Sequence, residues 1–470
     1  MPDISMTKKM TELRVLFAHM QDNLSGVETR FHPLWPAYLA AFAEQQFGTE
    51  KFKFRFASKE IHYEIESFKP QIVAIGAVSP KFNDAIECAR IAKRYGVSTI
   101  VGGVHISTLP ECLTEGMDVG CIGEGEQSFA ELLAHFFEHG VFRGSQLADI
   151  KGIVYRKNGE LVKTPIRPLI QTFDQIPHPK RSLVGYLRHD YLLTGRGCPY
   201  KCSFCSCSRF WRKARYASPS YVLEEIRELT ENGAKIIRFE DDSLTTNTRR
   251  LQEISNLIVA DGLDRRVQFS CWARANEVNA EAVDSLKKMN VRLVWMGLES
   301  GCQRTLDYLK GHVTVEQNLR ATSLLKDAGI QTNGFFIIGS PSETEEEIMQ
   351  TYKFIRESQL DFATVNILTP LPGTATWDHW TEKNSIVDGL DWSRLFSIRF
   401  DPRFDIIISE EVSPAELYRL YRKFAMLSRS MKRKANFRKL RQLELPRIAH
   451  ELLISFRLFY KKLTVRHRTL

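Results

Sequence analysis

Short apolar runs alternate with helix-like segments along most of this 470-residue chain, and this alternation restricts its fold more than any other feature. Strands that alternate with helices form parallel sheets, because each helix carries the chain back to the edge where the previous strand began. Several early runs are apolar throughout, as in strands buried on both faces. The first part of the chain is therefore predicted to be an open, doubly wound sheet. Its expected strands are 14–19, 51–57, 72–76, 98–102 and 119–123, with helices at 36–46, 83–95 and 125–137.

A second series of strand–helix units begins at Tyr191. Six such units predict a parallel barrel that lacks two of the eight units of a closed one, with its site at the carboxyl ends of the strands. The expected strands are 191–195, 235–240, 267–273, 292–298, 332–338 and 362–368. The expected helices are 220–232, 249–261, 280–289, 316–328 and 343–357, and further helix is expected from residue 413.

The region between the two series is predicted to be a β-hairpin and an extended linker. Asn158-Gly159 separates two strand-like runs and is typical of a tight hairpin turn. Pro177 and Pro179 favour an extended chain after it. The expected α/β architecture comprises a Rossmann-like sheet (11–145), the hairpin and linker (146–185), a partial (β/α)6 TIM barrel (186–400) and a basic helical C-terminal region (401–470).

Cysteine usage and hydropathy exclude several classes of protein. Nine scattered cysteines without a disulfide framework indicate a protein of the reducing cytoplasm. The first ten residues lack the apolar stretch of a secretory signal. No run of about 18 apolar residues is present, so no transmembrane helix is expected.

The net charge of +9 belongs to the tail of the chain. Residues 422–470 hold 15 Lys and Arg against 2 Asp and Glu, so the remainder is slightly acidic. The stretch 453–462 alternates apolar and basic residues, which would suit contact with the anionic inner face of a membrane. The alternatives are a tail packed on its own barrel with a solvated basic face, and nucleic-acid binding. Because no nucleic-acid motif is present, a nucleic-acid partner is not expected.

Three cysteines, Cys198, Cys202 and Cys205, follow the first predicted barrel strand with the spacing C-x3-C-x2-C. Three thiolates on one loop suit a [4Fe–4S] cluster, and they leave one iron without a protein ligand, where chemistry can occur. A structural zinc site with Cys207 as the fourth ligand is the alternative reading of these residues.

With this loop at the end of a barrel strand, the chain resembles the radical S-adenosylmethionine (SAM) enzymes over residues 12–375. It is most similar to the branch with an N-terminal cobalamin-binding domain, which includes the anaerobic magnesium-protoporphyrin ester cyclase and cobalamin-dependent methylases. In this family the three cysteines, with an aromatic residue such as Phe204 before the last, bind the [4Fe–4S] cluster. The resemblance implies that SAM binds the open iron and that a one-electron donor such as flavodoxin or ferredoxin triggers its cleavage to a 5′-deoxyadenosyl radical.

The same resemblance assigns a SAM site to the ends of four later strands. Acids follow the second strand, a Glu-Ser pair follows the fourth, and the fifth and sixth carry the segments that lie near adenine. A solvated acidic loop and a helix-capping serine are the alternative interpretations of the first two. The residues implied are Glu240, Asp241, Asp242, Glu299, Ser300, Gly339 and Pro370.

Cobalamin is the third cofactor that the resemblance implies. The strand ends of the first sheet that would hold it carry Ser79, Gly102, Gly103 and Gly123. The D-x-H-x-x-G run that supplies a cobalt-binding histidine in other cobalamin domains is missing. Cobalamin is therefore expected to bind without a histidine from the protein, or to have been lost. His105 is interpreted as a loop histidine held by a backbone hydrogen bond.

The resemblance implies an enzyme that abstracts hydrogen from an unactivated C–H bond of a small, hydrophobic substrate. Cobalamin-dependent methylation of that carbon is the leading hypothesis. The alternatives are oxidative cyclisation, desaturation or rearrangement, modification of RNA, and a zinc-binding interaction protein. No catalytic side chain is assigned; Cys271 and Cys302 are interpreted as small buried residues rather than as hydrogen donors.

Overall fold

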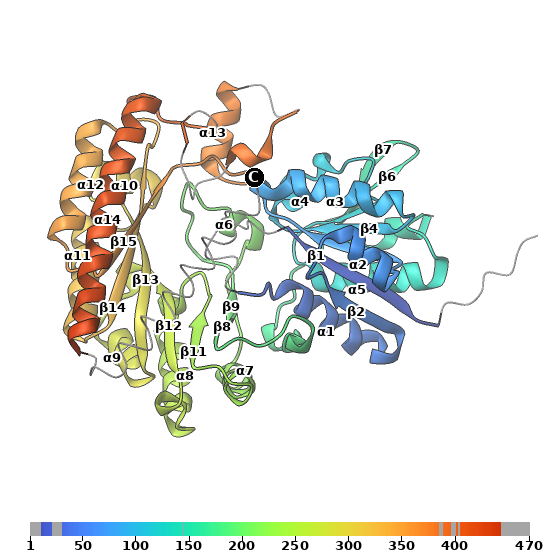
Figure 1. The fold of residues 1–470 in the computed structure, drawn as a ribbon, viewed down its shortest axis with the longest axis horizontal. Coiled ribbons are helices and arrows are strands. Elements are labelled where there is room, and N and C mark those ends of the chain that lie inside the picture. Colours follow the sequence, from blue (N-terminus) through green and yellow to red (C-terminus); the bar gives the residue numbers. More distant parts are fainter. Residues whose placement is uncertain are drawn as a thin grey trace, which may run out of the picture.

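The computed structural model describes residues 11–20, 31–143, 145–384, 389–395, 401–402 and 405–442. In these residues the chain forms two largely parallel sheets that lie beside each other, each covered by helices (Figure 1). The expected α/β fold, with a Rossmann-like sheet followed by a six-stranded partial barrel and a C-terminal helix, is confirmed. The limits of the four predicted units stay a prediction.

The first sheet has seven strands in the order β2-β1-β3-β4-β5-β6-β7, of which the first five are parallel. The parallel strands are β1 (Leu13–His19), β2 (Phe52–Phe56), β3 (Ile72–Gly76), β4 (Ser98–Gly102) and β5 (Val119–Cys121). The hairpin β6 (Ile153–Lys157) and β7 (Glu160–Lys163) is confirmed, with Asn158 and Gly159 both at positive φ as a type I′ turn requires. It was expected between the domains, but it pairs antiparallel with β5 and extends the sheet.

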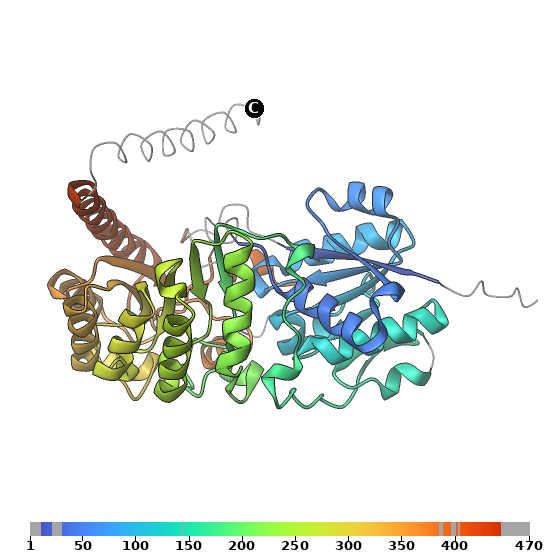
Figure 2. The same cartoon turned by 90° about the horizontal axis from the view of Figure 1, so that it is seen from below.

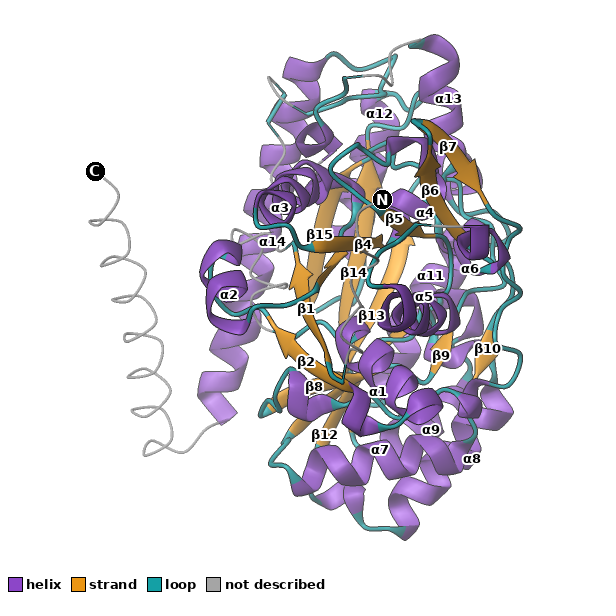
Figure 3. Ribbon diagram, turned by 90° about the vertical axis from the view of Figure 1, so that its right-hand side faces the viewer, coloured by secondary structure: helices purple, strands orange, loops and turns teal. Residues whose placement is uncertain are grey.

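Helices bury both faces of this sheet, which explains why its strands are apolar throughout. Leu13, Val15 and Phe17 of β1 pack in the core beneath α1 and α5, while Leu16 and Ala18 pack toward α2 and α3. In Figure 3 the first domain faces the viewer. The helices are α1 (Trp35–Phe47), α2 (Ile61–Phe68), α3 (Phe82–Arg94), α4 (Val104–Thr108) and α5 (Gly125–His139), of which α2 and α4 were not expected.

The second sheet has six parallel strands in chain order, and β15 and β8 are its two edges. It is the expected incomplete barrel. Its strands are β8 (His189–Leu192), β11 (Ile236–Phe239), β12 (Gln268–Ala273), β13 (Val291–Glu299), β14 (Gln331–Ile338) and β15 (Phe362–Ile367). Its helices are α7 (Pro219–Glu231), α8 (Thr248–Ala260), α9 (Ala280–Lys288), α10 (Gln303–Leu309), α11 (Val315–Asp327) and α12 (Glu345–Glu357). Figure 2 shows these helices along the outside of the barrel.

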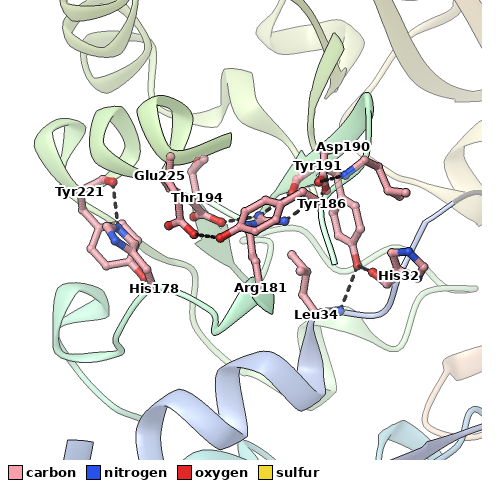
Figure 4. Close-up of polar contacts among 12 residues, drawn as sticks. His32, Leu34, His178, Arg181, Tyr186, Asp190, Tyr191, Thr194, Tyr221 and Glu225 are labelled. Carbon is pink, nitrogen blue, oxygen red and sulfur yellow. Dashed lines mark hydrogen bonds and ion pairs between the residues drawn. The ribbon is translucent and has the colours of Figure 1, made fainter. Parts of the chain in front are cut away.

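Arg181 holds the linker against the barrel. Its buried guanidinium pairs with Asp190 of β8 and with Glu225 of α7, and it donates to the carbonyl oxygen of Tyr191 (Figure 4). The hydroxyl of Tyr191 in turn accepts from the backbone N–H of Leu34, just before α1, at 3.1 Å. The first strand of the barrel is therefore joined directly to the start of the first helix of the first domain by Tyr191.

The chain returns to the first domain after the barrel. Helix α13 (Ala375–Lys383) carries Trp377, which packs with Trp392 on the apolar face that contains Phe82 of α3. Helix α14 (Pro414–Gln442) then packs along β15 and α12 through residues such as Leu417 and Phe424.

The basic stretch 453–462 lies outside the described residues, so its membrane contact stays a prediction. Within the described residues, no helix combines the length and apolarity that crossing a membrane would take.

Candidate active site

The three cysteines of the C-x3-C-x2-C loop line one cavity of about 500 Å³ at the carboxyl ends of the barrel strands. The loop begins after β9 (Gly195–Arg196) and ends in α6 (Cys207–Trp211), which Figure 1 shows between the two sheets. Strand β9 pairs antiparallel with β10 (Arg215–Tyr216), so both ends of the loop are fixed by one short hairpin. The backbone N–H of Ser203 also donates to the carbonyl oxygen of Leu309 at 2.9 Å, which holds the middle of the loop against α10.

The thiols of this loop lie in different surroundings. Burial raises the pKa of Cys198 to about 11 and also raises the pKa of Cys202, whereas a hydrogen bond from Cys207 lowers the pKa of Cys205. The sulfur of Cys207 lies 3.1 Å from Oδ2 of Asp242. Among the described residues, no three His, Cys, Asp or Glu side chains converge as the ligands of a single metal ion do.

Glu240, Asp241 and Asp242 all line this cavity, and their predicted contact with SAM stays a prediction. Asp241 is buried and accepts from the backbone N–H of Thr194 at 2.6 Å and from its hydroxyl, and burial raises its pKa. Asp242 accepts from the backbone N–H of Gly197 at 3.1 Å, directly before the first cysteine. These two carboxylates therefore hydrogen-bond the backbone that leads into the cysteine loop, while Glu240 is an ion-pair partner of Arg238.

Glu299 lines the same cavity and has a strained backbone. Its φ is +61°, in the left-handed region that non-glycine residues rarely adopt, and it lies at a register shift between β13 and β14. Its carboxylate is buried, with Oε1 3.5 Å from Nζ of Lys310, and Lys310 also donates to the carbonyl oxygen of Gly297. Burial raises the pKa of Glu299 and the lysine opposes that shift. Such strain at a buried charge is characteristic of binding sites.

We expect replacement of Glu299 by Gln to weaken SAM binding by about 1.5–3 kcal/mol, the scale for a hydrogen bond to a charged group. The expectation rests on the position of its carboxylate in the cavity. Calorimetry on protein with a reconstituted cluster measures it. The control is Glu346→Gln on α12, because Glu346 is exposed and is not among the described residues that line the cavity. Equal SAM affinity in Glu299→Gln and in the unaltered protein would remove Glu299 from the site.

The other residues expected to contact SAM lie behind the cavity wall. Among the described residues, Ser300, Gly339 and Pro370 are not part of the lining. Gly339 has φ +84°, and a side chain there would approach Leu417 of α14 to 2.9 Å. Its backbone N–H donates to Glu343 at 2.7 Å. The predicted contact of Ser300, Gly339 and Pro370 with SAM therefore stays a prediction.

A second cavity, of about 340 Å³, lies at the carboxyl ends of the first sheet. Gly102, Gly103 and Gly123 line it, and their contact with cobalamin stays a prediction. A Cβ added at Gly102 or Gly123 would have no other atom within 4 Å, so these two glycines leave open space at the strand ends. At Gly103, φ is +109° and a Cβ would lie 2.4 Å from the carbonyl oxygen of Ala77. A floor of this kind admits a large planar group close to the backbone.

Two histidines lie near this cavity, and both are held by other groups. His105 is fully buried against Phe82 and Trp392, and its Nδ1 lies 3.0 Å from Oγ of Ser79. The partner is thus a hydroxyl and not the backbone group that was expected, and burial lowers the pKa of His105 to about 3. His19 does line the cavity, but its Nδ1 accepts from Nε1 of Trp35 at 3.2 Å.

Three further expected residues lie away from the cavities. Ser79, expected to contact cobalamin, is buried beside His105 and is absent from the described lining. Cys271 and Cys302 are buried, as interpreted, and neither is among the described residues that line a cavity.

A buried cluster of four charges joins the second cavity to the cysteine loop. Arg196, two residues before Cys198, lies 2.8 Å from Glu124 and 2.6 Å from Glu126, and Arg215 lies 3.0 Å from Glu124. All four side chains are less than 10% exposed. Sequence reasoning missed this cluster, although Glu124 directly follows Gly123, which it singled out.

Arg274 and Lys310 were also missed, and both line the first cavity. Arg274 directly follows β12, which is the signal that could have found it, since site residues follow barrel strands. Lys310 ends α10, a helix that was not expected.

Comparison with known proteins gives two family matches. Residues 192–355 match the radical SAM superfamily, and residues 21–133 match the B12 binding domain. The first range contains the three cysteines and the second contains the three glycines of the other cavity.

Relatives match most of the chain. A protein of Pyrococcus horikoshii named as an uncharacterized methyltransferase is 32% identical over 404 residues, which is 82% of this chain and 86% of the relative. The anaerobic magnesium-protoporphyrin IX monomethyl ester cyclase of Rubrivivax gelatinosus is 29% identical, over 80% of this chain and 71% of the cyclase.

Among solved structures, the radical SAM methyltransferase TsrM of Kitasatospora setae, with cobalamin and a [4Fe–4S] cluster bound, has the same fold. The TM-score is 0.69 at 17% identity, and the match covers 87% of this chain and 91% of TsrM. Both the partial barrel and the first sheet fall within an overlap of this extent.

Proposed function

Because the chain belongs to the radical SAM superfamily, in the branch with an N-terminal B12-binding domain, we propose that it transfers a methyl group from SAM to an unactivated carbon of a small, hydrophobic substrate. It is a cobalamin-dependent radical SAM enzyme whose cofactors are a [4Fe–4S] cluster, SAM and cobalamin. The relative from Pyrococcus horikoshii is named a methyltransferase, which supports methylation as the reaction.

The described residues fit these cofactors. Cys198, Cys202 and Cys205 would hold the cluster at one wall of the first cavity. The glycine-lined floor of the second cavity would admit the planar ring of cobalamin. When bound, the cluster and SAM supply a 5′-deoxyadenosyl radical and cobalamin carries the methyl group. The enzyme requires a one-electron reductant, for which flavodoxin or ferredoxin is the proposed partner.

A single segment that lines both cavities carries the proposal. Residues 193–211 place Leu193, Arg196 and Trp211 in the wall of the second cavity, and they place the three cysteines in the wall of the first. A substrate carbon between the two cavities would thus be reached from both sides, as hydrogen abstraction and methyl delivery require. The apolar part of the remaining lining supports an apolar substrate. It includes Phe204, Trp272, Phe335, Ile337, Leu368 and Leu371.

Oxidative cyclisation or rearrangement is the second candidate. It is favoured by the 29% identity to the magnesium-protoporphyrin ester cyclase. Cyclisation also removes hydrogen from an unactivated carbon, so it would use the same cysteine cavity. The two reactions differ in what becomes of the methyl group of SAM.

We expect methylation to release S-adenosylhomocysteine and 5′-deoxyadenosine together, since SAM would serve as methyl donor and as radical source. Protein is purified anaerobically, its cluster reconstituted and cobalamin added, and the SAM products are measured by mass spectrometry. Extracts of the source organism supply candidate apolar substrates. Release of 5′-deoxyadenosine alone, with cobalamin bound, would contradict methyl transfer and support the second candidate. Protein without added cobalamin is the control.

A further inference from the structure

Arg274 lies directly against the cysteine loop, and its role is not covered by the proposed reaction. It follows β12, is 5% exposed, and its Nη1 donates to the sulfur of Cys202 at 3.3 Å. Its guanidinium also lies over the ring of Tyr200, 3.8 Å from the ring centre. It is thus a buried cation in contact with two members of the loop.

The other donors of this guanidinium are held by neutral groups. Nε donates to Oδ1 of Asn276 at 3.0 Å, and Nη2 donates to the carbonyl oxygens of Lys310 at 3.3 Å and Gly311 at 3.0 Å. Among the described residues, no carboxylate lies within ion-pair distance of Arg274 (the neighbouring Glu299 carboxylate pairs with Lys310). A buried arginine without a paired carboxylate is costly, so its charge needs an anion that only a loaded site would supply.

We propose that Arg274 raises the reduction potential of the cluster by donating its N–H to the sulfur of Cys202. Reduction adds one electron, taken from a one-electron donor of the flavodoxin or ferredoxin class, and therefore one negative charge. A fixed cation and an N–H donor at a cluster sulfur stabilise the more negative state. No proton moves and no bond breaks in this step. The proposal rests on the assignment of the cluster to the three cysteines.

The shape of the side chain is part of the proposal. Four donors of the planar fork are directed at four different acceptors, so the Nη1–sulfur contact is held by the other three. A lysine would retain the charge but could not satisfy this set, because its donors radiate from one nitrogen. Arg274 is therefore a positioning residue for the electron-transfer step, distinct from the residues that hold SAM.

The test is a redox titration of the reconstituted cluster followed by electron paramagnetic resonance, without SAM, cobalamin or substrate. We expect Arg274→Gln to lower the equilibrium constant for one-electron reduction about tenfold, which is about 59 mV. Arg274→Lys should fall between Gln and the unaltered protein. Iron analysis on each variant shows that the cluster has assembled. The control is Arg238→Gln, which removes a cation from the preceding strand β11. Arg238 pairs with Glu240 and lies over the rings of Phe31 and Trp295.

An unchanged potential in Arg274→Gln with a full complement of iron would overturn the proposal. A fall of equal size in the reduction potential of Arg238→Gln would also overturn the proposal, since it would indicate a general charge effect. If Arg274→Gln assembles too little cluster, Arg274→Lys takes its place, and an unchanged potential there overturns the proposal as well. Because no substrate or cobalamin is present, a negative result leaves the methyl-transfer proposal standing. Failure of methyl transfer likewise leaves this measurement valid.

Discussion

Replacing Cys198, Cys202 or Cys205 by Ala abolishes the visible iron–sulfur absorbance and all SAM cleavage. This is the result we expect, because each thiolate supplies one of the three protein ligands of the cluster, and the open iron must be held in place to bind SAM. All three side chains line one cavity at the barrel mouth. Absorbance spectra and iron analysis after anaerobic reconstitution measure the cluster, and mass spectrometry of 5′-deoxyadenosine measures cleavage.

Cys207→Ala is the matched control, because Cys207 lines the same cavity on the same loop. Its thiol contacts Asp242 and is not part of the C-x3-C-x2-C spacing. Iron content and SAM cleavage should both survive this change. If Cys207→Ala loses metal as completely as the other three, a four-cysteine site replaces the open-iron cluster.

Removing Arg196 should destabilise the protein by about 3–5 kcal/mol, the cost of leaving buried carboxylates without their partner. Arg196→Met keeps much of the side-chain volume but leaves Glu126 without its ion pair and Glu124 with Arg215 alone. The free energy of unfolding is measured in urea. Because Glu124, Glu126 and Arg196 also line the second cavity, the variant should bind cobalamin more weakly.

Arg209→Met provides the comparison for this variant. Arg209 pairs with Asp378 at 2.6 Å, but both side chains are about half exposed. Exposed pairs are worth about 0–1 kcal/mol, so this loss should be small. Equal destabilisation by Arg196→Met and Arg209→Met would contradict the structural role assigned to the buried cluster.

The strands could be predicted from the sequence because burial on both faces leaves a local mark. The run 72–76 is apolar throughout, and it forms β3 with all five residues buried. The hairpin turn at Asn158-Gly159 is equally local, since positive φ restricts residue type. The attachment of that hairpin to β5 was not predictable, because which strand an edge pairs with is decided by tertiary packing.

The site was predictable to a similar extent. Cysteine spacing marks the loop, and a position after a parallel strand marks Glu240 and Glu299. Charge partners such as Lys310 and Arg196 lie 11 and 70 or more residues from the groups they neutralise. Ion pairs between residues so far apart in the sequence leave no local sequence pattern from which they could be predicted. Ser79 was expected in the second cavity for its place at a strand end, but its hydroxyl is taken up by His105.

The return of the chain after the barrel means that one apolar face of the first domain is completed by residues far away in sequence. The face of the first sheet that carries Phe82 packs against Trp377 and Trp392, which come from beyond the barrel. Asn83 and Asp391 add a 2.7 Å hydrogen bond across the same junction. An exchange of the first domain for a counterpart from another protein would therefore have to include the segment that carries these two tryptophans.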